Sequence, residues 1–136
     1  MGMEFSSTKL RSGRPAVFIR SSGQVSGEDA ERVKREVGPN GQYHGLPMLT
    51  TVEPETNFSM EARKGFADMG DATADYPVAV VLTSAPMRLI IHFIVKASNL
   101  KRERPTNLKF FSDESAAMKW LDSEAQRLAD APKGAP

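Results

Sequence analysis

Residues 77–84, PVAVVLTS, and residues 85–95, APMRLIIHFIV, decide the fold of this chain. The first stretch is an apolar run without alternation, which predicts a strand that is buried on both faces. Pro86 and the apolar spacing that follows it predict a helix directly after that strand. A strand covered on both faces is typical of the parallel sheet of an α/β protein. These two stretches therefore predict an α/β fold.

Strands and helices alternate in the rest of the sequence. The other predicted strands are 5–10, 15–20, 46–52 and 107–111, and the other predicted helices follow the N-caps Ser26, Ser59 and Ser112. The turn residues at 11–14, RSGR, predict an antiparallel hairpin between the first two strands. We therefore expect a mixed sheet of about five strands, parallel after the hairpin, with about four helices. We expect one domain over residues 1–130 and a disordered tail over residues 131–136.

The composition is that of a globular protein, with 40% apolar and 26% charged residues among 136. The net charge of +1 provides no strong field for nucleic acid, and we read the basic segment 101–104, KRER, as a solvated loop. Cysteine is absent, which excludes disulfides and thiolate chemistry. No secretory signal is visible, and the longest apolar run, 89–95, is shorter than the roughly 20 residues that span a bilayer. We expect a cytoplasmic protein without an integral membrane segment.

Motifs for catalysis are missing from the sequence. His44 and His92 are the only histidines, and neither belongs to a zinc-binding pattern. No glycine-rich phosphate loop and no Gly-x-Ser-x-Gly elbow occurs. Residues 41–45, GQYHG, offer flexible backbone beside two polar rings, and we consider them as the lining of a ligand cleft near the strand ends. We predict a non-enzymatic protein without catalytic residues, metal or cofactor.

Several patches of the sequence resemble one family. They are residues 17–30 (VFIRSSGQVSGEDA), 58–63 (FSMEAR), 78–81 (VAVV) and 110–121 (FFSDESAAMKWL). Together with the order of elements, they resemble STAS domains, in particular a poorly characterised bacterial branch called STAS-like or SpoIIAA-like. The resemblance extends from Pro15 to Leu128. It implies a domain that is not an enzyme and that binds protein partners or small ligands.

Ser59 is the candidate switch residue. In the anti-anti-sigma-factor group of this family, a kinase modifies a serine at the start of the second helix, and Ser59 matches that position. A phosphate there would meet free N–H groups and the positive end of the helix dipole. The residues on either side, Phe58 and Met60, differ from the Asp-Ser and glycine-rich pattern of that group. Ser59 is therefore predicted to be an N-cap, with phosphorylation as a second role that the resemblance implies.

Two functions from different classes remain. The first is a regulatory protein-interaction module, which contacts a protein partner or a second copy through Phe58, Met60, Arg63, Arg88 and His92. Arg88 and His92 form a polar stripe at i, i+4 spacing that we expect to face solvent. The alternative is a binder or carrier of a small hydrophobic ligand or lipid, of the Sec14-like kind. It is suggested by residues 87–95, which carry more apolar surface than one sheet face covers.

Overall fold

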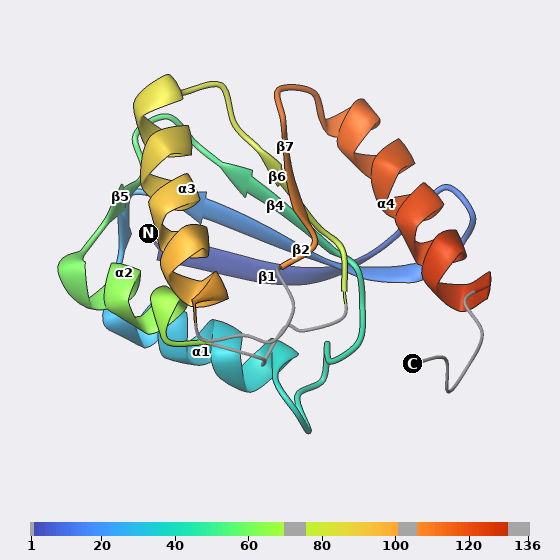
Figure 1. Cartoon of the computed structure of the whole chain (residues 1–136), viewed down its shortest axis with the longest axis horizontal. Coiled ribbons are helices and arrows are strands. Elements are labelled where there is room, and N and C mark those ends of the chain that lie inside the picture. Colours follow the sequence, from blue (N-terminus) through green and yellow to red (C-terminus); the bar gives the residue numbers. More distant parts are fainter. Residues whose placement is uncertain (1, 70–75, 101–105, 131–136) are drawn as a thin grey trace.

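The computed structural model describes residues 2–69, 76–100 and 106–130 (Figure 1). The expected tail, 131–136, and the basic segment 101–104 lie outside the described residues. The strands are β1 (Gly2–Lys9), β2 (Pro15–Ser22), β3 (Gln24–Val25), β4 (Met48–Val52), β5 (Asn57–Phe58), β6 (Val78–Val81) and β7 (Leu108–Phe111). The helices are α1 (Gly27–Val37), α2 (Met60–Ala67), α3 (Ala85–Asn99) and α4 (Glu114–Asp130).

Five strands form one mixed sheet in the order β1-β2-β4-β6-β7. Strands β1 and β2 pair antiparallel, from Gly2 opposite Ser22 to Lys9 opposite Pro15. The pairs β2–β4, β4–β6 and β6–β7 are parallel. This arrangement confirms the predicted α/β fold with an N-terminal hairpin. The apolar stretch that decided the fold contains β6, which lies between two parallel neighbours and buries Val78, Ala79 and Val80.

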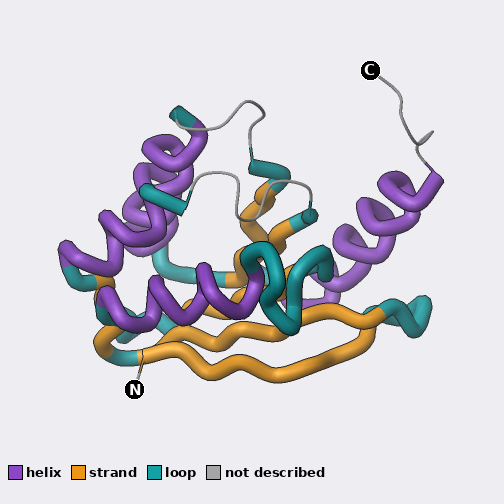
Figure 2. Tube along the Cα trace, turned by 90° about the horizontal axis from the view of Figure 1, so that it is seen from below, coloured by secondary structure: helices purple, strands orange, loops and turns teal. Residues whose placement is uncertain are grey.

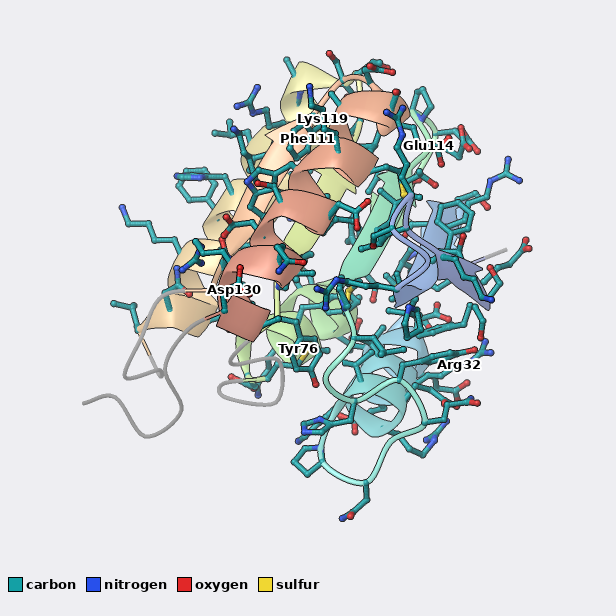
Figure 3. The ribbon with its side chains drawn as sticks, turned by 90° about the vertical axis from the view of Figure 1, so that its right-hand side faces the viewer. Arg32, Tyr76, Phe111, Glu114, Lys119 and Asp130 are labelled. Carbon is teal, nitrogen blue, oxygen red and sulfur yellow. The ribbon has the colours of Figure 1, made fainter. Side chains whose placement is uncertain are left out.

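The two faces of the sheet carry different helices. Alternate residues of the strands point to opposite faces, and the core divides accordingly into two clusters. Val17 and Ile19 of β2 pack with α1, α2 and α3, whereas Ala16 packs with Leu121 of α4. Figure 2 shows the strands as one layer, with α4 separate from the other three helices. In Figure 3, Phe111 of β7 accordingly lies beside α4, the helix that carries Lys119.

The β1–β2 turn is bonded to the last helix. Arg11 Nη2 donates to Ser115 Oγ at 2.7 Å, the Ser12 backbone N–H donates to Asp122 Oδ2 at 3.1 Å, and Arg14 Nη2 donates to Gln126 Oε1 at 2.6 Å. These pairs are 104 to 112 residues apart in the sequence. The first and last elements of the described chain are thus joined directly, as Figure 1 shows at the right of the molecule.

The predicted helix caps are correct in two cases and wrong in one. Ser26 caps α1 in a capping box with Asp29, and Ser59 caps α2. Ser112 does not cap α4. The cap is Asp113, whose carboxylate accepts from the backbone N–H groups of Ser115 at 3.2 Å and of Ala116 at 3.3 Å. A carboxylate offers two acceptor oxygens to the free N–H groups of the first turn, and Asp113 directly precedes the helix.

Strands β3 and β5 were not predicted from the sequence. They form a parallel pair beside the main sheet, with Gln24 opposite Asn57 and Val25 opposite Phe58. Two residues are too short to show an alternating pattern. The pair matters because β5 leads directly into the cap of α2, and it turns the Phe58 side chain into the core.

Candidate ligand cavity

A cavity lies between the sheet and the layer of helices α1, α2 and α3. Its volume is about 150 Å³. Among the described residues, its walls come from six strands, three helices and two flanking residues: Met3, Ile19, Ser21, Val33, Met48, Thr50, Val52, Phe58, Phe66, Met69, Val78, Val80, Ile91, Ile94, Val95, Ser98, Thr106 and Leu108. None of these residues carries a charge. The cavity is therefore suited to an uncharged, largely apolar molecule, because a buried charge without a partner is unfavourable.

The polar atoms of the walls are hydroxyl groups. Thr106 Oγ1 donates to Asn99 Oδ1 at 2.9 Å. Ser21 is fully buried, and its Oγ has no hydrogen-bond partner among the described residues. The backbone carbonyl of Ser21 is paired, since it accepts from Thr56 Oγ1 and from the Glu53 N–H, both at 3.0 Å. The carbonyl of Ser21 is thus paired, whereas its side-chain hydroxyl, on the cavity side, is not paired within the described residues.

Small polar side chains at inward-facing strand positions help to leave this space. Ser21 follows Val17 and Ile19 on the same face of β2, where a larger apolar residue would fill the layer under the helices. Thr50 pairs in register with Ile19 on one side and with Val80 on the other. The signal for the cavity in the sequence is a small hydroxyl residue in the apolar alternation of a buried strand.

The cavity walls divide by exposure. Ile19, Ser21, Val52 and Phe58 are buried. Seven described wall residues are half-buried: Thr50 in the middle of β4, and six at the carboxyl ends of α2 and α3 and at the start of β7, namely Phe66, Met69, Ile94, Val95, Thr106 and Leu108. The cavity therefore has a side that reaches solvent and a buried side, and Ser21 belongs to the buried side.

The residues predicted around the start of α2 lie in different environments. Ser59 Oγ accepts from the Ala62 N–H at 3.0 Å, which is the N-cap interaction. Met60 is 72% exposed, whereas Phe58 is 5% exposed and belongs to the cavity wall rather than to the surface. Arg63 is half-buried, and its Nε donates to the Phe58 carbonyl at 3.1 Å. Of these four residues, Met60 is the one whose side chain is freely exposed.

Helix α3 carries the remaining predicted contact residues. Arg88 and His92 are exposed, as the stripe at i, i+4 spacing predicted. The Arg88 guanidinium lies 5.1 Å from the centre of the Phe110 ring, and the His92 ring lies edge-on to Phe93 at 6.1 Å. Leu89 is 55% and Phe93 58% exposed. The outer face of α3 is therefore both apolar and basic.

The segment 41–45 does not line the cavity. It precedes β4 and therefore lies at the amino end of that strand, not at the carboxyl ends where open α/β sheets bind ligands. Tyr43 stacks on Phe5 with ring centres 6.5 Å apart, and His44 Nδ1 lies 3.0 Å from the Val37 carbonyl oxygen. The Tyr76 hydroxyl donates to the same carbonyl. These contacts hold the segment against the end of α1, on the side where Figure 3 labels Tyr76 and Arg32.

Titratable groups contribute little to the cavity. Across residues 2–69, 76–100 and 106–130, no cluster of three or more His, Asp or Glu side chains is arranged to hold a metal ion.

Hydrogen bonds from Arg127 and Asn107 lower the pKa of the Glu124 carboxyl. This carboxyl joins α4 to the residue before β7 and is not part of the cavity. In the same ranges, no helix is long and apolar enough to cross a membrane.

The sheet order, the N-terminal hairpin and the distribution of helices define a SpoIIAA-like fold, and comparison with solved structures supports this assignment. The crystal structure of an uncharacterized protein of the DUF3478 family from Shewanella loihica PV-4, described as having a SpoIIAA-like fold, matches with a TM-score of 0.61. The match covers 88% of this chain and 94% of that chain at 17% sequence identity, so the likeness is one of fold. No protein-family model and no curated protein matches the chain.

Proposed function

We propose that this chain is a non-enzymatic binding domain that takes up a small apolar molecule between the sheet and helices α1, α2 and α3. The observation that carries the proposal is the cavity of about 150 Å³, whose walls are uncharged and mainly apolar in the described part of the chain. An enclosed apolar cavity of about this volume accepts a benzene-sized molecule, and the cavity between the sheet and the helices has the same volume although one side reaches solvent. Apolar walls with a few placed polar groups are also the usual form of small-molecule sites. This function corresponds to the second of the two classes expected from the sequence.

Mass spectrometry of the natural protein tests the proposal first. The chain is purified gently from its own host, measured under native conditions, and then extracted with organic solvent. A hydrophobic molecule present at about one per chain supports the proposal. An empty extract, together with a native mass equal to that of the chain alone, counts against it.

A matched pair of variants on α3 locates the site. Ile91→Phe enlarges a side chain of the cavity wall, whereas Leu89→Phe makes a comparable change at a residue that is 55% exposed. A ligand that binds only the folded state raises the melting temperature. Benzene should therefore raise the melting temperature of the wild type and of Leu89→Phe, and raise that of Ile91→Phe less. An equal rise in all three proteins would place binding elsewhere.

A second candidate function is the regulatory protein-interaction module. The observation that favours it is the outer face of α3, where Leu89 and Phe93 are more than half exposed beside Arg88 and His92. Exposed apolar side chains in a group are typical of interaction sites. Ser59, followed by the exposed Met60, would be the position of a phosphorylation switch, since a phosphate at a helix N-terminus meets free N–H groups.

Native mass spectrometry distinguishes this module from a simple carrier. A phosphate mapped to Ser59, or a co-purifying protein that Phe93→Glu releases while the fold stays intact, would support the module. Ser59→Ala and Ser59→Asp should then bind that partner with different affinities. Equal affinities would contradict the switch, and they would leave Ser59 as a cap alone.

A further inference from the structure

We infer that the cavity selects an uncharged molecule of about one aromatic ring that carries a single hydrogen-bonding group, which pairs with Ser21 Oγ. The inference rests on the proposed function and specifies the chemistry of its ligand. It starts from an unusual group, because buried polar atoms in folded proteins are almost always paired. Ser21 Oγ is buried, borders the cavity and has no partner in the described part of the chain.

The position of Ser21 determines which end of a ligand would be polar. Ser21 lies on the buried side of the cavity, among Ile19, Val52 and Phe58, and the half-buried wall residues other than Thr50 lie toward the side that reaches solvent. A ligand would therefore enter with its polar group first and leave its apolar body against Phe66, Ile94 and Val95. This orientation is the reverse of that of an ordinary lipid, whose polar end stays in water.

The chemistry of the walls narrows the ligand class further. A serine hydroxyl both donates and accepts, so it can pair with a hydroxyl or a carbonyl group. A carboxylate or phosphate would lose its hydration without a cationic partner from the described walls, since none of the wall residues within 2–69, 76–100 and 106–130 is charged. The volume of about 150 Å³ matches one ring rather than a long acyl chain. The expected class is a phenol-like molecule or a small neutral alcohol or ketone.

Benzene and phenol are the probes, because they differ by one hydroxyl. Both are titrated into the full wild-type chain and into Ser21→Ala, with chemical shifts of the cavity residues as the measurement. The ratio of the benzene dissociation constant to the phenol dissociation constant should fall about five- to tenfold in Ser21→Ala, the size of one net hydrogen bond. Benzene binding itself should change little, since the variant removes one oxygen atom. Ser6→Ala, an exposed serine of β1, is the matched control and should leave the ratio unchanged.

The outcomes distinguish a failure of the inference about Ser21 from a failure of the proposed ligand-binding function. If benzene and phenol both bind but the ratio is the same in wild type and Ser21→Ala, the inference about Ser21 is overturned and the cavity function stands. If neither molecule binds the wild type, the proposed function and this inference both fail. Ser21→Cys provides a second variant of similar size with a weak donor. Its ratio should lie between those of wild type and Ser21→Ala, and a ratio below that of Ser21→Ala would also overturn the inference.

Discussion

Replacing Ser21 by valine should make the protein more stable, although most substitutions in a core make a protein less stable. The reason is the unpaired Oγ of Ser21, which is buried next to unfilled space. Valine removes the hydroxyl, adds apolar volume and suits a β-strand. The variant therefore replaces the unpaired hydroxyl, which we assign to ligand binding, with apolar atoms that pack in the core.

The size of the effect follows from two contributions. A buried hydroxyl without a partner costs about 1–3 kcal/mol, which the variant recovers. One additional buried methyl group contributes about 0.8 kcal/mol. Overpacking, which costs about 1–3 kcal/mol in a full core, is avoided because the cavity of about 150 Å³ receives the new atoms. The free energy of unfolding should rise by about 2–4 kcal/mol.

Urea denaturation measures this change directly. With an m-value of about 2 kcal/mol/M, the midpoint should move upward by about 1–2 M while the m-value stays the same. Ser6→Val makes the same chemical change at an exposed position of β1 and should alter the free energy of unfolding by less than about 0.5 kcal/mol. If Ser21→Val is unchanged or less stable than the wild type, Ser21 Oγ is already satisfied or the space is not there. Either result refutes the reasoning.

Three other predictions concern the framework of the fold. Leu121 is fully buried under the sheet, whereas Leu128 is 38% exposed. In urea denaturation, Leu121→Ala should lower the free energy of unfolding by about 2–5 kcal/mol and Leu128→Ala should lower it much less. Equal losses of stability would contradict the packing of α4. Ser59→Ala should lower the free energy of unfolding by about 1 kcal/mol through loss of the N-cap, whereas Ser59→Asp, which keeps an acceptor, should not; a loss in both would contradict the cap. Because hydrogen bonds from Arg127 and Asn107 lower the pKa of Glu124, its charged form stabilises the protein above the ordinary pKa of 4.5, and that contribution disappears as pH falls through the lowered pKa. The stability difference between wild type and Glu124→Gln should thus be present at pH 7 and shrink as pH falls below 4.5; a difference that is the same at every pH has another cause.

The framework of the molecule could be predicted because its signals are local. The apolar run at 77–84 contains β6, and the alternation of strands and helices predicted a hairpin followed by parallel strands. Ser26 and Ser59 were recognised as caps because a serine before a helical pattern has one common role. Ser112 was chosen over Asp113 because both residues are good caps and the boundary of a helix is uncertain by a residue or two.

The cavity could not be predicted in this way, because it arises between segments that are distant in the sequence. Ser21 looks like a turn residue when it is read beside Ser22 and Gly23, and only the pairing of β2 with β4 places it in a wall. Phe58 was predicted to contact a partner because it precedes Ser59 at the start of a helix. Its burial could not be predicted, because the β3–β5 pair that turns it inward contains only two residues per strand. The exposure of Leu89 and Phe93, by contrast, agrees with the excess of apolar surface that the sequence indicated for residues 87–95.

The bonds between the β1–β2 turn and α4 have a consequence for the growing chain during synthesis. The hairpin is synthesised before α4, and its turn finds its partners on α4 only about 100 residues later. Until then, Ala16, Leu49 and Ala79 have no Leu121 to cover them. The sheet can pair its strands early, yet one of its faces stays open to water and to chaperones until translation reaches the last helix. Covering of this face therefore depends on the late synthesis of α4 rather than on early formation of the hairpin.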